Sequence, residues 1–450
     1  MIFKDEELDI ISEKANVAQF VSFSPELEMR YSHLKTHTPN HRFVSVEDAA
    51  SAVLGSSNAR SVNIRSFSPE QNRGNPFIRN LTTVDEIARN VQQIADSGLY
   101  SIVFETIPID DGGIPGGIMM NRVIEFSTTD CPRILENSPE QVATLPAGMA
   151  IEMIKTVYGI SPALTGYENK RVEFSIHPKR LGHRHDHTII WEVADTDDIC
   201  IQPRYVWPND FSMMIGDKAY GLLIAQLFGF RVPRTTVVIR SGLIHDFSFG
   251  RETNSSIRWV RTCPTVQQPG KYSTVRGMCD PHMLMVSDDP DNESVVSCLV
   301  QHEVTAVYSG ATITGSTGPI IEGVAGTGDQ FMQGKAAPNP LPNNAVRAVL
   351  DVFRRLRPTL GPVRFEWVYD GTNVWIVQLH VGSTLSGGQI IYPGDFSHPV
   401  IFDVAYGLSE LRHLIKNLGD DDSVIVVGNV GLTSHVADVL RKAKIPSRLY

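Results

Sequence analysis

Residues 363–378 read Val-Arg-Phe-Glu-Trp-Val-Tyr-Asp-Gly-Thr-Asn-Val-Trp-Ile-Val-Gln. Two runs rich in β-branched and aromatic residues, 363–369 and 373–378, flank an Asp-Gly pair, which is a strong signal for a β-hairpin. In such a hairpin Glu366 and Gln378 lie on neighbouring strands and close together on one face. A carboxylate and an amide oxygen suit magnesium, so this pair is a candidate metal site.

Helices and strands alternate on both sides of the hairpin. Small and acidic residues at 194–198 mark a domain boundary, so we expect a mixed α+β domain over residues 1–195 and a second domain over 203–385. Residues 388–450 follow a strand, helix, strand, helix plan, which predicts a small α/β unit. The segments expected to be regular are helices 83–97, 219–230, 344–356, 408–418 and 434–443, and strands 100–107, 123–126, 171–176, 188–193, 235–239, 257–261, 295–301, 400–404 and 423–427.

Composition and charge exclude several classes of protein. The 450 residues carry 40 Lys and Arg against 50 Asp and Glu, a formal charge of −10, so no positive field exists to gather nucleic acid. The five cysteines, Cys131, Cys200, Cys263, Cys279 and Cys298, show no CxxC spacing, which predicts reduced thiols in a cytoplasm. The N-terminus is acidic and residues 219–230 are too few to span a bilayer, so we expect no membrane partner.

Alternating histidines form a candidate metal site in the N-terminal domain. His183, His185 and His187 would project from one face if their segment were a continuous strand, and would then converge on zinc or iron. The alternative is a polar hairpin between strands 171–176 and 188–193. The loop at 110–117, rich in Gly and Asp, is expected to be a turn cluster.

Phosphate-binding signals gather in the second domain. Gly216-Asp217-Lys218 opens a helix, whose positive end favours phosphate, with Lys218 as a point charge beside it. Arg258 and Arg261 are separated by an odd spacing on a strand, so they face opposite sides and at most one of them enters the cleft.

Several blocks of this domain follow one another in a characteristic order, namely residues 215–219, 230–235, 260–265 with 268–270, 300–304 with 309–314, 321–329, 365–367 and 377–380. In this order they resemble the ATP-grasp nucleotide-binding domain of phosphoenolpyruvate synthase, pyruvate phosphate dikinase and rifampin phosphotransferase. That family's opening normally reads glycine-glycine-lysine-glycine, then a helix and a proline-bearing strand.

The resemblance implies a two-lobed fold over 203–385 and a role for each matching residue. Lys218 and Arg261 would contact ATP phosphates, and Glu322 would meet the nucleotide sugar. Gln301, Glu303 and Val304 would form the adenine hinge. Glu366 and Gln378 would bind magnesium. ATP and magnesium are therefore the expected cofactors.

Two positions depart from the family pattern. The hairpin normally ends in glutamine, any residue, arginine, and that arginine grips the transferred phosphoryl group; here His380 stands in its place. A neutral imidazole offers one donor where a guanidinium offers a charged fork, so transfer would be slow or would need another cation. Asp329 replaces a glutamate after the glycine-rich stretch, which shortens its reach.

Residues 431–446 resemble the swivelling phosphohistidine domain, in which a helix begins at a histidine and carries an arginine six residues later. By this resemblance His435 would be the covalent carrier, with Arg441 pointing back toward it. The alternative is a plain helix N-terminus, with Ser434 as the cap and the imidazole in solvent.

The sequence thus predicts an ATP- and magnesium-dependent phosphotransferase of the dikinase type, with His435, Arg261 and His380 as catalytic residues. The phosphoryl acceptor would be a small molecule or a protein, and residues 1–195 are a candidate substrate or partner domain. The first alternative is a regulatory protein that binds ATP without turnover, because His380 replaces the arginine. The second is a metal enzyme built on the three alternating histidines.

Overall fold

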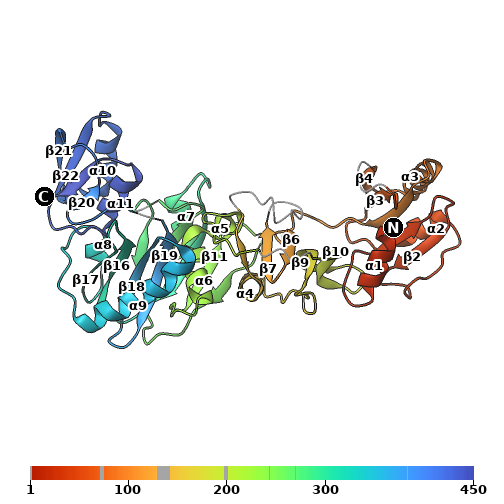
Figure 1. The fold of residues 1–450 in the computed structure, drawn as a ribbon, viewed down its shortest axis with the longest axis horizontal. Coiled ribbons are helices and arrows are strands. Elements are labelled where there is room, and N and C mark those ends of the chain that lie inside the picture. The colour runs from red at the N-terminus through yellow and green to blue at the C-terminus, as the bar shows by residue number, and fades with distance from the viewer. Residues whose placement is uncertain are drawn as a thin grey trace. The chain divides into compact units, whose positions relative to one another are not determined.

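The chain forms two compact units, Met1–Val206 and Trp207–Tyr450 (Figure 1). The computed structural model describes residues 3–70, 75–128, 142–196, 201–242, 244–268, 270–382 and 384–450. Cys131, Cys200 and Pro269 lie outside the described residues, as do positions 197 and 198 of the expected boundary. The other three cysteines are free thiols.

The first unit opens with a five-stranded antiparallel sheet. Its elements are α1 (Lys4–Ser12), β1 (Phe20–Phe23), β2 (Met29–His33), α2 (Val46–Ser56), β3 (Val62–Phe67), β4 (Phe77–Leu81), α3 (Val84–Asp96) and β5 (Tyr100–Glu105). The strand order is β2-β1-β5-β3-β4. Helices α2 and α3 contact each other and β5, and bury their apolar side chains in one core with the sheet. The helix and strand expected at 83–97 and 100–107 are confirmed as α3 and β5.

A second antiparallel sheet completes this unit, in the order β10-β9-β6-β7-β8. Its elements are β6 (Ile114–Met120), β7 (Val123–Ser127), β8 (Thr144–Pro146), α4 (Ala147–Tyr158), β9 (Lys170–Leu181) and β10 (Asp186–Asp195). The turn cluster expected at 110–117 was wrong from Ile114 onward. A Cβ at Gly117 would lie 2.5 Å from the ring of Phe174, so this glycine lets β6 pass closely over a buried aromatic side chain.

The second unit begins with the sheet β12-β11-β15-β13-β14. Its elements are α5 (Asp210–Ile215), α6 (Asp217–Leu227), β11 (Thr235–Ile239), β12 (Phe247–Phe249), β13 (Arg258–Pro264), β14 (Thr274–Arg276), α7 (Pro281–Asp288) and β15 (Val295–His302). All its strand pairs are antiparallel. The helix expected at 219–230 is present as α6, shifted two residues toward the N-terminus at its start.

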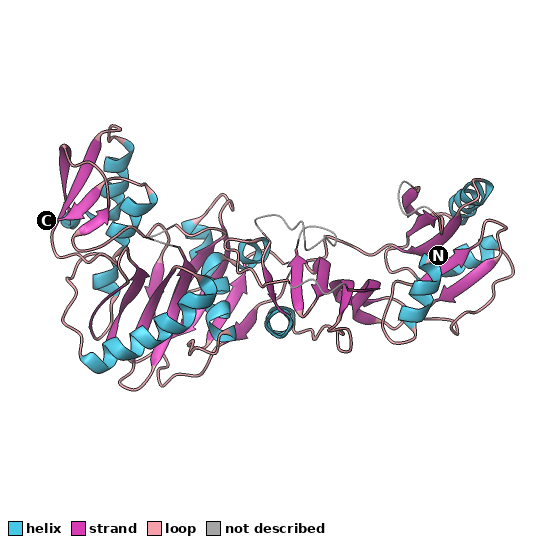
Figure 2. Ribbon diagram, in the orientation of Figure 1, coloured by secondary structure: helices cyan, strands magenta, loops and turns pink. Residues whose placement is uncertain are grey.

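The hairpin of residues 363–378 lies in the next sheet, β17-β16-β18-β19, and is confirmed. The elements are β16 (Tyr308–Thr314), β17 (Pro319–Ala325), α8 (Asp329–Met332), α9 (Asn343–Leu360), β18 (Val363–Tyr369) and β19 (Val374–Val381). Helix α9 contacts all four strands, and Figure 2 shows it lying across them. Helix α6 contacts β19, so one helix touches both sheets.

A small third sheet completes the second unit, in the order β20-β23-β22-β21. Its elements are β20 (Ile390–Tyr392), β21 (His398–Asp403), the 3-10 turn η2 (Val404–Tyr406), α10 (Gly407–Lys416), β22 (Asp422–Val427), α11 (His435–Lys442) and β23 (Ser447–Leu449). The expected alternation of strands and helices is present. The sequence interpretation missed β23, which pairs in parallel with β22 after the helix ends.

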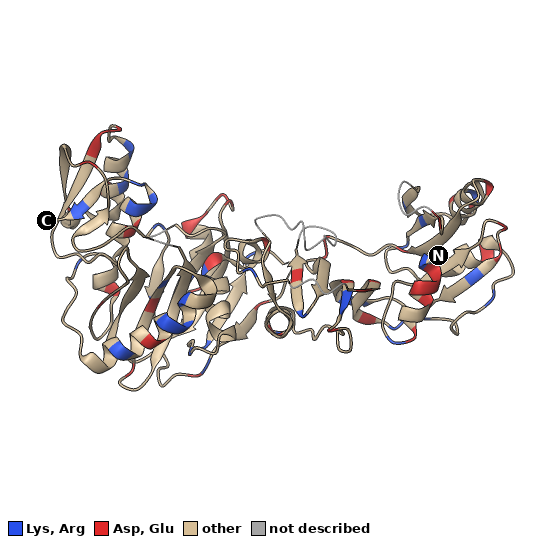
Figure 3. Cartoon of the chain, viewed as in Figure 1, with Lys and Arg blue, Asp and Glu red and all other residues tan. Residues whose placement is uncertain are grey.

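The chain is therefore a mixed α/β protein with several antiparallel sheets and one partly parallel sheet. The positions of positively and negatively charged residues are interspersed along both units (Figure 3). Within the described part of the chain, no helix is both long and apolar enough to cross a membrane.

Candidate functional site

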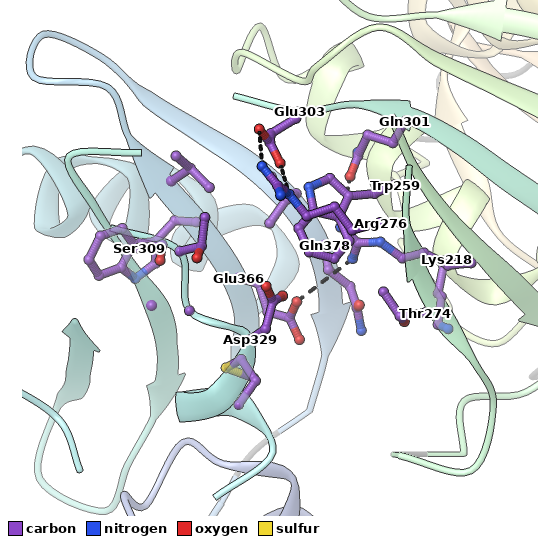
Figure 4. A pocket seen from close by; sticks show the side chains of 18 of the residues that line it. Lys218, Trp259, Thr274, Arg276, Gln301, Glu303, Ser309, Asp329, Glu366 and Gln378 are labelled. Atoms are coloured by element: carbon purple, nitrogen blue, oxygen red, sulfur yellow. Dashed lines mark hydrogen bonds and ion pairs between the residues drawn. The ribbon is translucent and has the colours of Figure 1, made fainter. Parts of the chain in front are cut away.

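A cavity of about 370 Å³ lies in the second unit, and we call it the central cavity. Its wall is built from both antiparallel sheets, from α6 and from the start of α11. The polar and aromatic residues that line it include Lys218, Trp259, Arg261, Arg276, Gln301, Glu303, Ser309, Asp329, Glu366, Gln378 and His435. Figure 4 shows the side chains of Lys218, Glu366 and Gln378 gathered around this space. A volume of this size falls within the range of small-molecule sites.

Lys218 reaches the cavity from the first turn of α6. The helix starts at Gly216, which has a φ of +95° and where a Cβ would lie 2.5 Å from Sγ of Cys263. A glycine is therefore required at the sharp turn before the helix. Nζ of Lys218 donates to the carbonyl of Thr262 at 2.8 Å, and burial lowers the pKa of this ammonium group.

Arg261 is the second cation of the cavity. Its Nη2 donates to Oε1 of Gln301 at 3.0 Å, and its Nη1 lies 3.9 Å from Oε2 of Glu366. Arg258 does not line the cavity, and it donates to the backbone carbonyl of Ser256 instead. The prediction that at most one of these two arginines enters the cleft is confirmed, because strand side chains alternate between faces.

Glu366 and Gln378 are direct partners in the register of β18 and β19, and both line the cavity. Their oxygens form a hard donor set of the kind that magnesium prefers, so these residues fit such an ion. His380 does not line the cavity. Its Nδ1 lies 2.8 Å from Oδ2 of Asp217, and its Nε2 lies 2.6 Å from Nε2 of Gln378. The side chain expected to grip a phosphoryl group is thus held behind the wall.

Glu303 and Val304, which the family resemblance assigns to the adenine hinge, also line the cavity. Glu303 accepts two hydrogen bonds from Arg276, at 2.6 and 3.1 Å. The sequence interpretation missed Arg276, because β14 has only three residues and shows no periodic pattern. It also missed Trp259, although its spacing of two from Arg261 on one strand places both side chains on one face.

Asp329 lines the cavity at the start of α8. Burial raises the pKa of its carboxyl group, while the nearby Arg261 and Arg276 act in the opposite direction. Its placement supplies an additional carboxylate next to the two guanidinium groups.

Glu322 does not line the cavity, although the family resemblance assigns it to the nucleotide sugar. Its carboxylate accepts hydrogen bonds from the backbone N–H of Leu432 at 3.1 Å and from the N–H and hydroxyl of Thr433, both at 2.8 Å. A Cβ at Gly431 would lie 2.5 Å from Oε2 of Glu322, so the missing side chain makes room for the carboxylate. Glu322 therefore holds the C-terminal segment against the second sheet.

His435 lines the central cavity from the first position of α11. Ser434 caps this helix by accepting a bond from the N–H of Ala437 at 3.3 Å, but His435 is only partly exposed and lines the cavity. Its Nδ1 is buried and has no hydrogen-bond partner in the described ranges. Burial lowers the pKa of His435, which favours the neutral ring with a free lone pair.

Further contacts fix α11 in place. Arg364 on β18 forms a buried ion pair with Asp438, and Nζ of Lys442 donates to the carbonyl of Gln267 at 2.8 Å. Arg441 points back along its helix, donating to the carbonyl of Leu432 at 2.7 Å and to Oγ of Ser386 at 3.2 Å. Its guanidinium group braces the segment before His435 and does not line the cavity.

The three alternating histidines of the first unit do not form a metal site. His183 and His185 lie in the turn between β9 and β10, where His185 has a φ of +54°, so they do not share a strand face with His187. His187 points its Nδ1 to the carbonyl of His177 at 2.9 Å. No group of three His, Cys, Asp or Glu side chains among the described residues is placed to hold a metal ion.

No known family model matches the chain, and no curated protein matches its sequence. Among solved structures, the chain is similar to the D-alanine–D-alanine ligase from Helicobacter pylori, with 10% identity and a TM-score of 0.25. The match covers 38% of this chain and 53% of the ligase, so it spans about half the length of that enzyme. A likeness this weak assigns neither a fold nor an activity.

Proposed function

We propose that this protein is an ATP- and magnesium-dependent phosphotransferase of the dikinase type, which transfers a phosphoryl group from ATP to His435. Residues 203–385 would be its ATP-binding domain, and residues 388–450 would carry the histidine. The observation that carries the proposal is that His435 lines the same cavity as Lys218 and Arg261.

The charges of the cavity support a triphosphate ligand. Lys218 and Arg261 would neutralise phosphate oxygens, and Glu366 and Gln378 would hold the magnesium ion. When bound, that ion would neutralise the negative charge that develops on the phosphates. The hinge at Glu303 and Val304, together with the indole of Trp259, would hold the nucleobase.

In the proposed step, a nitrogen of the neutral His435 ring forms a bond to phosphorus. The bond from that phosphorus to the bridging oxygen breaks, and its electron pair leaves with the nucleotide. The proton on the other ring nitrogen is released to solvent. The cations of the cavity stabilise the charge that accumulates on the transferred oxygens.

The test is incubation of the full chain with ATP labelled at the β or γ phosphorus. We expect protein-bound label that is labile in acid and stable in base, and that disappears in His435→Asn. His413→Asn is the matched control, because His413 lies exposed on α10. Label that persists in His435→Asn, or no label on a protein that binds ATP, would refute the transferase.

A second candidate function is supported by the position of His380. This residue replaces the arginine of the resembled family and is held by Asp217 and Gln378 outside the cavity. A protein that binds ATP without transferring phosphate would act as a nucleotide-dependent regulator. Tight ATP binding with no label on His435 is the result that distinguishes it.

A further inference from the structure

A series of contacting polar side chains, which we call the polar relay, lies behind the wall of the central cavity. It runs from Trp207 to Asp217, then to His380 and Gln378. Nε1 of Trp207 donates to Oδ1 of Asp217 at 2.6 Å, and Nδ1 of His380 lies 2.8 Å from the other carboxylate oxygen. Nε2 of His380 lies 2.6 Å from Nε2 of Gln378. Only Gln378 of these four residues lines the cavity.

The last three residues of this series are almost completely buried. Asp217, His380 and Gln378 are 4, 5 and 8% exposed. Water therefore cannot replace a donor or acceptor that is wrongly oriented. If two donors or two acceptors faced each other in this series, a buried polar group would lack a hydrogen bond.

The proton positions along the polar relay follow from the chemistry of its ends. The amide nitrogen of Gln378 faces Nε2 of His380. An amide nitrogen only donates, so Nε2 is the acceptor, and the ring proton lies on Nδ1, which faces the carboxylate of Asp217. The amide oxygen of Gln378 is consequently left free of the relay.

The oxygen left free is the atom that a cation site needs. Gln378 lies directly opposite Glu366 in the register of β18 and β19. With the amide reversed, an N–H₂ group would stand beside the carboxylate in place of an oxygen and would repel a divalent cation. The orientation of one amide thus decides between a donor set of two oxygens and a mixed set.

We propose that Asp217 and His380 are positioning residues that fix the amide of Gln378 so that its oxygen serves a divalent cation bound with Glu366. This inference deepens the proposed function and rests on its cation site, but it does not depend on phosphoryl transfer. It also gives His380 a role that differs from that of the arginine it replaces in the resembled family.

The experiment uses the isosteric variant Asp217→Asn in the full chain. The asparagine can present its N–H₂ to His380, which would move the ring proton to Nε2 and turn the amide oxygen of Gln378 toward the ring. We expect the affinity for Mn²⁺, measured from the free-ion signal in electron paramagnetic resonance, to fall at least about tenfold. The control is Asp85→Asn, which changes an exposed aspartate in the first turn of α3.

The double variant Asp217→Asn with Gln378→Glu separates positioning from a general loss of structure. A glutamate accepts from the protonated Nε2 with one oxygen and keeps the other for the cation. We expect Mn²⁺ affinity within about threefold of the unmodified protein. Unchanged affinity in the single variant, no recovery in the double variant, or no Mn²⁺ binding by the unmodified protein would each overturn the proposal.

A second measurement covers the case in which Asp217→Asn does not fold. Nitrogen-15 NMR of the unmodified protein, with His380 assigned by its loss in His380→Asn, must show protonation at Nδ1 and not at Nε2. The Nε2-protonated form would overturn the proposal. The Mn²⁺ and NMR results can be as expected while His435 takes up no label from ATP. In that case the positioning role of Asp217 and His380 is supported and the phosphotransferase proposal is refuted.

Discussion

Glu322 accepts hydrogen bonds from both the backbone N–H and the hydroxyl of Thr433, each at 2.8 Å. This contact joins β17 to the segment just before His435. We expect Glu322→Ala to lower the free energy of unfolding by about 1–3 kcal/mol, because two backbone donors lose their partner. Hydrogen exchange at residues 431–434 should rise in the variant, measured by mass spectrometry. Glu293→Ala, at an exposed site, is the control, and equal exchange in both variants would contradict the role of Glu322.

Arg261 and Arg258 offer a comparison on one strand. Arg261 lines the cavity, whereas Arg258 donates to the carbonyl of Ser256 on the other side. We expect Arg261→Ala to weaken ATP binding about 10- to 100-fold, the usual effect of losing a charged hydrogen bond. Arg258→Ala should change it less than about twofold. Calorimetric titration with ATP and magnesium is the measurement, and similar losses in both variants would place the nucleotide elsewhere.

Replacing either of two helical glycines by alanine should change the stability of the protein, in opposite directions at the two positions. A Cβ at Gly221 on α6 would lie 2.1 Å from the carbonyl oxygen of Leu379 on β19, so Gly221→Ala should destabilise the protein by about 1–3 kcal/mol. Gly55 on α2 has nothing within 4 Å of that position, and Gly55→Ala should stabilise it by about 0.5–1 kcal/mol. Chemical denaturation measures both changes. A stable Gly221→Ala protein would show that α6 and β19 are not packed as described.

The stability of the first unit should depend on pH through His183. Burial, with Arg184 and His33 nearby, lowers the pKa of this ring from 6.5 to about 4. Between these values the unfolded chain binds a proton that the folded chain does not, so stability falls as the pH decreases from 6.5 to 4. We expect a loss of about 1–2 kcal/mol from this partly exposed group.

The variant His183→Asn removes the titrating ring and should flatten the dependence of stability on pH in this window. His185→Asn is a suitable control, because His185 is exposed and its positive φ is tolerated by asparagine. Thermal unfolding between pH 6.5 and pH 4 follows the effect. Identical curves for the unmodified protein and His183→Asn would contradict the assignment.

The sequence predicted those parts of the fold that depend on local patterns. The hairpin of residues 363–378 has alternating apolar side chains and an Asp-Gly turn, and the turn sets the register that pairs Glu366 with Gln378. The opposite faces of Arg258 and Arg261 follow from the same periodicity of two. Strand β23 has only three residues, too few for a pattern, and its place depends on parallel pairing with β22.

Contacts between distant segments could not be predicted. His380 faces Asp217 and Glu322 faces Thr433, and in each case the partner is remote in the sequence. His380 stands where the resembled family has an arginine, and it meets Asp217 in the structure. The histidine pattern at 183–187 was misleading because Gly182 and His185 have positive φ angles, which turn the chain where a strand was assumed.

The position of His435 on the wall of the central cavity sets the order in which the proposed enzyme can use its substrates. While ATP or its product occupies the space, no other molecule can approach the imidazole from that side. The spent nucleotide must therefore depart, or α11 must detach, before an acceptor takes the group. Initial-rate kinetics should accordingly be of the ping-pong type, with parallel double-reciprocal plots when ATP and acceptor are varied together.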